Sequence, residues 1–321
     1  MDEKVEKFEG KNWTLYNGDC VRVLDTLPEN SIGFSIFSPP FCSLYSYSDN
    51  RADMGNVYSK EDFFEHFNFL IPKLFKVLMP GRCISVHCMN LPTSKERDGI
   101  IGIYDFRGDI VRAFTQAGFV YHSEVCIWKD PLIAALRTKA IGLAHKQIIK
   151  DSAICRQGLA DYLCTFRKPG DNTKPITHKP LGFTEWIGDE DNGPTAKVGK
   201  TGKTNKFSHE IWRKYANPVW TDIRQTRVLK VQLGREQKDE KHLCPLQLDV
   251  IERALTLWSC EGDIVLSPFA GIGSEGYCAV EMKRKFIGIE LKPSYCSVAV
   301  RNLQRAENKL TQTDLLSIKE I

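Results

Sequence analysis

Hydrophobic positions along this chain follow two alternating periods. Phe63, Phe67, Leu70 and Leu74 recur at helical spacing, whereas residues 32–37 form a short apolar run of the kind that a buried strand needs. Strands are predicted over residues 14–16, 32–37, 83–87, 119–128, 162–166, 264–266 and 285–289. Helices are predicted over residues 21–27, 60–78, 105–117, 246–257, 274–282 and 294–310. Strands that alternate with helices indicate an α/β fold with a doubly wound, mixed but mostly parallel sheet.

One stretch interrupts this alternation. Residues 169–206 are rich in Gly, Pro, Thr, Asn and Lys and contain few apolar residues, which is typical of an irregular excursion. We therefore predict an insertion over residues 169–239 that separates two parts of one domain, residues 1–168 and residues 240–321. A chain of 321 residues is long enough to bury the core of such a domain.

Composition excludes several classes of protein. No apolar run approaches the roughly 20 residues that a membrane span needs, and the charged N-terminus lacks the apolar segment of a secretory signal. We expect a soluble, cytoplasmic protein. The eleven cysteines include no CxxC pair and no Cys/His cluster at zinc-ligand spacing, so we expect reduced core thiols and no metal site. A net charge of +4 allows a polyanionic partner without requiring one.

A glycine-rich turn follows the predicted strand 264–266 and opens a helix. Gly271, Gly273 and Gly276 let the backbone approach a ligand closely, and Glu290 at the end of the next strand can accept hydrogen bonds from a ribose diol. This arrangement predicts a site for an adenosine-containing cofactor. The glycines also spell the GxGxxG of dinucleotide-binding proteins, but only one helix follows Glu290, so a second nucleotide half would have to lie upstream. A tight turn without a ligand is the remaining alternative.

The predicted strand 32–37 ends in the stiff sequence Ser38-Pro39-Pro40-Phe41. Two prolines fix the backbone and leave carbonyl groups without neighbouring N–H donors, which suits the presentation of acceptors to a ligand. An exocyclic base amine is a poor nucleophile because its lone pair is conjugated with the ring. The Ser38 hydroxyl and the Pro39 carbonyl could accept its protons while Phe41 stacks on the base. The alternative is a surface turn with an aromatic plug.

Together, the tetrapeptide and residues 269–273 resemble the catalytic and cofactor motifs of the amino-methylating DNA methyltransferases. The catalytic motif comes first, as in the circularly permuted β class and in phage- and prophage-type DNA methylases, and the target-recognition region lies between the motifs. The resemblance covers nearly the whole chain. It implies a Rossmann-like class I methyltransferase fold, S-adenosylmethionine as cofactor and double-stranded DNA as substrate. It also implies catalytic roles for Ser38, Pro39, Pro40 and Phe41.

The cofactor-binding residues follow from the same resemblance. Residues 14–20 resemble the segment whose Asp contacts the cofactor adenine. Residues 241–247 resemble the segment that lies over the methionine part of the cofactor. Residues 288–290 resemble the segment that carries the ribose-binding acid. The implied cofactor-binding residues are Asp19, His242, Pro245, Ser267, Phe269, Gly271, Gly273 and Glu290.

Two positions depart from the family pattern. Ser267 stands where the cofactor turn commonly begins with Asp, so a hydrogen bond usually assigned to that carboxylate is weaker or made elsewhere. Ser38 stands where adenine-modifying members usually carry Asp, and members with Ser mostly modify the 4-amino group of cytosine. The resemblance thus favours cytosine N4 and leaves adenine N6 as the alternative. Methylation of the cytosine ring carbon is excluded because its Pro-Cys nucleophile does not occur in this sequence.

The resemblance also implies that the target base is flipped out of duplex DNA, since a stacked base cannot reach the cofactor. Basic side chains must then hold the phosphates, although a run of such residues is also typical of a solvated surface. The predicted DNA-binding residues are Arg137, Lys139, Lys146, Lys150 and Arg156.

Two other functions fit the same motifs. An enzyme of the same chemistry could act on RNA, and a regulatory protein could bind the cofactor or DNA without turnover. The expected setting is the cytoplasm of a prokaryote, or of a cell that expresses a phage gene, in association with the nucleoid. The sequence is compatible with a homodimer and does not indicate whether a restriction endonuclease accompanies the chain.

Overall fold

The computed structural model describes residues 5–40, 60–93, 95–133, 149, 151–154, 157–176, 213–230 and 245–318. Within these ranges a nine-stranded sheet has the order β1-β2-β11-β10-β3-β4-β8-β7-β9. Its strands are β1 (Glu6–Glu9), β2 (Trp13–Asn17), β3 (Ile32–Phe37), β4 (Leu78–Met89), β7 (Val120–Ile127), β8 (Asp161–Arg167), β9 (Val219–Trp220), β10 (Ile264–Ser267) and β11 (Lys285–Glu290). Five of the eight neighbouring pairs are parallel, with β1–β2, β4–β8 and β7–β8 antiparallel. This is the predicted doubly wound α/β architecture.

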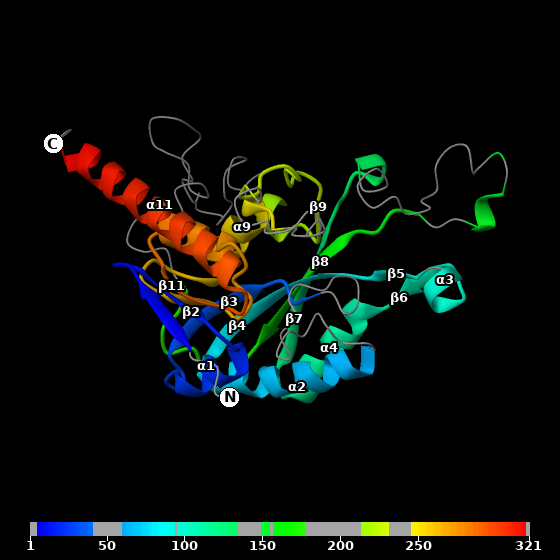
Figure 1. The fold of residues 1–321 in the computed structure, drawn as a ribbon, viewed down its shortest axis with the longest axis horizontal. Helices are drawn as coiled ribbons and strands as arrows, with labels where there is room; N and C mark the ends of the chain where they lie inside the picture. The colour runs from blue at the N-terminus through cyan, green and yellow to red at the C-terminus, as the bar shows by residue number, and fades with distance from the viewer. Residues whose placement is uncertain are drawn as a thin grey trace, which may run out of the picture.

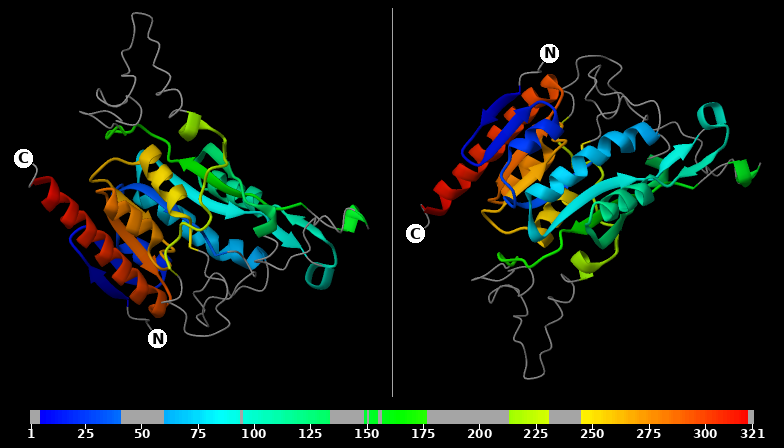
Figure 2. Two further views of the ribbon diagram at one scale, coloured as in Figure 1. Left: turned by 90° about the horizontal axis from the view of Figure 1, so that it is seen from above. Right: turned by 90° about the horizontal axis from the view of Figure 1, so that it is seen from below.

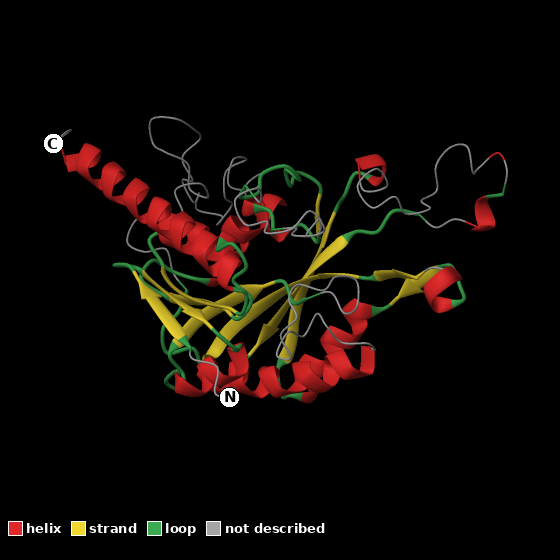
Figure 3. Cartoon of the chain, in the orientation of Figure 1, coloured by secondary structure: helices red, strands yellow, loops and turns green. Residues whose placement is uncertain are grey.

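Helices cover both faces of the sheet (Figure 1 and Figure 3). One face carries α1 (Cys20–Thr26), α2 (Lys60–Val77) and α4 (Phe106–Gln116). The other face carries α9 (Leu248–Trp258), α10 (Ser274–Glu281) and α11 (Pro293–Ile318). Each layer buries its own hydrophobic core against the sheet, as parallel strands require. No helix in the described ranges is long and apolar enough to cross a membrane.

The topological switch point of the sheet lies between β10 and β3. These strands run parallel, with Val265 opposite Phe34 and Leu266 opposite Ser35. From β10 the chain winds through α10 to β11 on one side, whereas from β3 it winds through α2 to β4 on the other side. Ligands of open α/β sheets bind beyond the carboxyl ends of the strands at such a point. The fold therefore places the ends of β3 and β10, which carry the two predicted motifs, beside one another.

The described strands and helices match the predicted pattern, with two differences in extent. β4 begins at Leu78 and continues through Pro80, where the sequence predicted a stop, because Gly81 adopts a φ of 72° and its N–H bonds to the carbonyl of Lys168 at 3.0 Å. The last helix continues past residue 310 to Ile318. The short elements that were not predicted include β1, β9 and the 3-10 helix Ser152–Ile154. They also include α3 (Lys95–Asp98) and the two strands on either side of it, β5 (Leu91–Thr93) and β6 (Gly102–Tyr104), which form a hairpin.

Part of the predicted insertion packs against the main domain. Residues 213–230 add β9 to the edge of the sheet beside β7, and Trp220 is only 1% exposed. The guanidinium of Arg253 lies 4.7 Å from the centre of the Trp220 ring and pairs with Asp222 at 2.8 Å. Figure 2 shows the described part of this segment beside the sheet, while most of residues 169–239 lie outside the described ranges. The limits of the insertion stay a prediction.

A buried arginine joins the central strands at the ends opposite the motifs. Arg82, which is 1% exposed, donates to the carbonyl of Gly33 at 2.7 Å and forms an ion pair with Asp263. Gly33 belongs to β3, Arg82 to β4, and Asp263 precedes β10. A charge in this position is tolerated because it is both paired and hydrogen-bonded. The contacts hold the starts of three central strands together.

Candidate active site

The Ser-Pro-Pro turn directly follows β3, at the switch point of the sheet. Every residue of β3 is buried, Pro39 is buried, and Ser38 is half-buried. The rings of Phe37 and Phe269 lie 5.7 Å apart at 58° to each other, so the ends of β3 and β10 are in contact. The strand ends that carry the catalytic and cofactor motifs therefore lie side by side.

A chain of hydrogen bonds leads from Ser38 into the sheet. The Oγ of Ser38 lies 2.9 Å from Nδ1 of His87 on β4, and Nε2 of His87 lies 3.1 Å from Oδ2 of Asp161 at the start of β8. The Nζ of Lys129, which follows β7, lies 2.6 Å from the same carboxylate oxygen. Four segments thus meet behind the serine.

Asp161 is an ionised group in the interior. Its side chain is 2% exposed, and burial on its own would raise the pKa of the carboxyl group. The hydrogen bond from the His87 ring and the charge and hydrogen bond of the Lys129 ammonium lower that pKa, and the net shift is downward. Asp161 is consequently a carboxylate that can only accept hydrogen bonds.

Sequence reasoning missed this cluster. His87 ends the predicted strand 83–87, and an ionisable residue within an otherwise apolar strand was a usable signal. Asp161 and Lys129 gave none, because the antiparallel placement of β8 between β4 and β7 brings them to His87.

The glycine-rich turn has the geometry of a ligand cradle. Gly271 adopts a φ of 54°, and a Cβ placed on it would meet nothing within 4 Å, so the space beside its backbone is open. Its N–H donates to Oε2 of Glu290 at 2.8 Å, while Oε1 accepts from the N–H of Lys292 at 2.8 Å. Gly273 adopts a φ of 84° and packs closely against Ala299. The turn is held by the Glu290 carboxylate and by its packing against Ala299, and it is open on one side.

Buried polar atoms beside this turn have no protein partner among the described residues. The hydroxyl oxygens of Ser267 and Ser274 are both buried and unbonded, although buried polar groups are normally satisfied. Both residues lie within four positions of Gly271, and Glu290 carries further acceptor capacity at the end of β11. These residues fit a polar, adenosine-containing cofactor.

Two further predicted cofactor residues, Asp19 and Pro245, lie at the starts of helices. Asp19 caps α1, since its Oδ1 accepts from the N–H of Val21 at 2.9 Å, and it follows β2, the neighbour of β11. Pro245 is half-buried just before α9. Their contacts with a cofactor stay predictions.

The remaining predicted site residues lie outside the described ranges. They are Phe41, His242, Arg137, Lys139, Lys146, Lys150 and Arg156. Their roles in base stacking, cofactor binding and phosphate binding therefore stay predictions.

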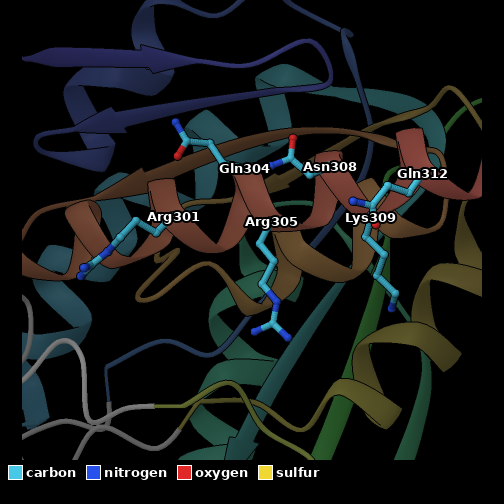
Figure 4. A pocket seen from close by; sticks show the side chains of 6 residues that line it. All are labelled: Arg301, Gln304, Arg305, Asn308, Lys309 and Gln312. Carbon is cyan, nitrogen blue, oxygen red and sulfur yellow. The ribbon is translucent and has the colours of Figure 1, made fainter.

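A hollow lies among exposed side chains of α11 (Figure 4). It is lined by Arg301, Gln304, Arg305, Asn308, Lys309 and Gln312. Ala299 and Asn302 of α11 contact the cofactor turn at Gly273 and Ile272, and the side chains that line the hollow extend from there toward the far end of the helix. This hollow is separate from the site at the strand ends.

Comparison with known proteins identifies the family. The family model described as DNA methylase, which covers N6 and N4 methyltransferases, matches residues 32–301. The chain belongs to the DNA methylase family. The Type II methyltransferase M.Cfr9I of Citrobacter freundii is 35% identical over 301 residues, which cover 94% of this chain and 91% of that relative.

Solved structures share the fold of this DNA methylase. The complex of a DNA modification methylase from Thermus thermophilus, TTHA0409, with S-adenosylmethionine has a TM-score of 0.60 at 20% identity and covers 92% of this chain and 96% of that one. The cytosine-N4-specific PvuII DNA methyltransferase has a TM-score of 0.53 at 16% identity, and the match covers 94% of this chain and 93% of that chain. The predicted class I methyltransferase fold is confirmed.

The family assignment also confirms the general reaction. The protein is an S-adenosylmethionine-dependent DNA methyltransferase of the kind that modifies exocyclic amines, with relatives among Type II modification enzymes. DNA is its substrate. When bound, S-adenosylmethionine supplies a methyl group on a positively charged sulfur.

Proposed function

We propose that this methyltransferase modifies N4 of cytosine at a specific site in duplex DNA. The observation that carries the proposal is a hydroxyl, rather than a carboxylate, at the catalytic strand end, because family members with Ser at the position of Ser38 mostly modify cytosine. PvuII methyltransferase, whose fold is similar, is cytosine-N4-specific. Adenine N6 is the alternative, since the family model covers both amines.

The proposed role of the Ser-Pro-Pro turn is to accept the two protons of the amine. Ser38 offers Oγ and Pro39 offers a carbonyl, and neither Pro39 nor Pro40 has an N–H to compete for them. Two accepted hydrogen bonds localise the nitrogen lone pair and make the amine a better nucleophile. Phe41 would stack on the flipped base and hold its plane. Catalysis then rests on positioning and on acceptors already fixed by a buried strand.

The proposed cofactor site lies next to this turn, at the end of β10. Gly271 and Gly273 allow close approach of the backbone, Glu290 would accept from the ribose hydroxyls, and Ser267 and Phe269 would line the pocket. We assign Asp19 to the adenine end and His242 and Pro245 to the methionine end.

The phosphates of the DNA would be bound by the basic residues of the segment after β7. These are Arg137, Lys139, Lys146, Lys150 and Arg156. Each phosphate contact releases a counterion, so neutral substitutions should weaken binding and lower its salt dependence. A homodimer and a partner endonuclease stay open predictions.

A direct test is to identify the methylated nucleoside. The purified protein is incubated with labelled S-adenosylmethionine and either genomic DNA or RNA, and the digested nucleic acid is analysed by mass spectrometry. We expect labelled N4-methylcytosine. Label on N6-methyladenine alone would replace cytosine by adenine, and label on RNA in preference to duplex DNA would overturn the substrate assignment.

The role of Ser38 is tested by Ser38→Ala. We expect methyl transfer to fall about 100-fold or more while the affinity for S-adenosylmethionine is unchanged, because the hydroxyl lies at the amine and not at the cofactor. Ser31→Ala is the matched control, since the Ser31 hydroxyl donates to the carbonyl of Pro28 on the exposed side before β3. Equal activity of the two variants would remove Ser38 from the mechanism.

A further inference from the structure

We propose that His87, held by Asp161 and Lys129, acts through the hydroxyl of Ser38 to take up the proton that the target amine loses. This inference rests on the proposed function of Ser38 and assigns a positioning role to three residues that no motif of the sequence marks. In this relay Ser38, at the end of β3, faces the amine, and the hydrogen bonds run from it through His87 to Asp161 inside the sheet.

The geometry fixes the direction of the relay. Asp161 is ionised and can only accept, so Nε2 of His87 must carry the hydrogen that is donated across 3.1 Å. The other ring nitrogen, Nδ1, then presents a lone pair to the Ser38 hydroxyl at 2.9 Å. Ser38 donates its own hydrogen inward and turns its oxygen lone pairs outward. An oxygen that donates to an acceptor becomes a better acceptor itself.

The surroundings keep His87 in one orientation. Its side chain is 9% exposed, and its ring is held at both nitrogens by β8 and by the turn after β3. Among the described residues, the charged and ionisable groups at this cluster include Asp161, the ammonium of Lys129 and the thiols of Cys88 on β4 and Cys126 on β7. The carboxylate oxygen of Asp161 contacts both the Lys129 ammonium and the His87 ring, so a positive charge on the ring would lie next to an ionised acid.

The same three side-chain types serve as a nucleophilic triad in acyl-transfer enzymes, but the backbone here does not suit that chemistry. An acyl-transfer site needs N–H donors for the oxyanion, commonly including the residue next to the nucleophile. Pro39 and Pro40 have no N–H at all. The groups beside Ser38 are therefore hydrogen-bond acceptors, which suits the uptake of protons from an amine. They do not suit a covalent intermediate on Ser38.

The proton balance of the step closes. The amine nitrogen forms a bond to the methyl carbon as the carbon–sulfur bond breaks, and the nitrogen is left with one proton too many. That proton passes to Oγ of Ser38 as the hydroxyl proton of Ser38 passes to Nδ1 of His87. The positive charge that leaves sulfur thus ends on His87, next to the carboxylate of Asp161, and the imidazolium later returns the proton to solvent.

A double-mutant cycle tests the relay. Ser38→Ala, His87→Phe and the double variant are compared by single-turnover methyl transfer on DNA, with cofactor affinity measured in parallel. We expect each single variant to lose about 100-fold in rate and the double variant to lose no more than Ser38→Ala alone, because residues that act as a unit are not additive. Cofactor affinity should be the same in all four proteins.

A conservative variant separates the relay from simple support of the fold. In His87→Asn the amide oxygen can replace Nδ1 as an acceptor for Ser38 but cannot take up a proton. We expect partial recovery of the rate relative to His87→Phe, and a pH dependence of the rate that differs from that of the wild-type protein because the amide cannot take up the proton. Ser85→Ala is the matched control, because it removes a buried 2.9 Å hydrogen bond to Thr165 between the same two strands without touching Ser38.

Each outcome decides a different point. Multiplying losses in the double variant, or an unchanged pH profile in His87→Asn, would overturn the relay while leaving amino methylation intact. A wild-type protein that methylates no base amine in any DNA would instead overturn the proposed function. If His87→Phe does not fold, the pH profile of His87→Asn and its rate in the Ser38→Ala background decide the matter.

Discussion

At the scale of single residues, Glu275 is a buried acid at the start of α10, beside the cofactor turn. It is 5% exposed, and burial raises its pKa from 4.5 to about 8, with the charge of Glu290 adding to the effect. Between pH 4.5 and 8 the folded protein therefore holds a proton that the unfolded chain has lost. The stability of the protein must fall as the pH rises through this window.

Substituting Glu275 by Gln removes this pH dependence. By pH 7 the wild-type protein should have lost about 3 kcal/mol of unfolding free energy relative to pH 4.5 on account of this one group. In Glu275→Gln that decline should be much smaller, as measured by urea denaturation at several pH values. Glu281→Gln, on the same helix but paired with Lys309, should keep the wild-type slope. Identical slopes in all three proteins would show that Glu275 does not titrate in this range.

At the scale of elements, the glycines of the cofactor turn have separable roles. A Cβ on Gly271 would enter open space, whereas a Cβ on Gly276 would lie 2.4 Å from the Phe286 ring and 2.6 Å from Leu303. Gly271→Ala should lower the unfolding free energy by only about 1–2 kcal/mol, because of its positive φ, yet weaken cofactor binding about tenfold or more.

Gly276→Ala should lower the unfolding free energy of the protein by about 1–3 kcal/mol or more, because the added methyl group overpacks the core. Calorimetric titration and thermal denaturation measure the two effects, and unaltered cofactor affinity in Gly271→Ala would contradict the assigned site.

Local pattern was sufficient to predict most elements of this fold. β3 was predicted at its observed bounds because a short apolar run ends in two prolines, and α10 because glycines precede its first turn. β9 was missed because a strand of two residues, Val219–Trp220, has no period to detect. It is a strand only because the edge of β7 lies beside it.

The candidate site divides in the same way. Ser38 and the cofactor turn could be predicted because each belongs to a motif of contiguous residues. The partners of Ser38 could not, because His87, Lys129 and Asp161 are brought together only by the order of β4, β8 and β7 in the sheet. A hydrogen-bonded group assembled from four strand ends leaves no local pattern in the sequence.

At the scale of the whole molecule, Trp220 is the buried side chain through which the segment 213–230 packs against the rest of the domain. Its ring is 1% exposed and lies against Arg253 of α9. Trp220→Ala should lower the unfolding free energy by about 3–5 kcal/mol, since it empties a large buried volume. Val219→Ala, at a 41% exposed position of the same strand, should cost far less. Similar losses for both in chemical denaturation would mean that β9 is not part of the cooperative core.

The order of the sheet has a consequence for how the protein is made. β2 and β3 follow one another along the chain, yet β10 and β11 lie between them. A ribosome therefore releases two unsatisfied sheet edges, one on each of these early strands, long before the segments that pair with them have been synthesised. Until then the nascent polypeptide exposes hydrogen-bonding edges of the kind that promote aggregation.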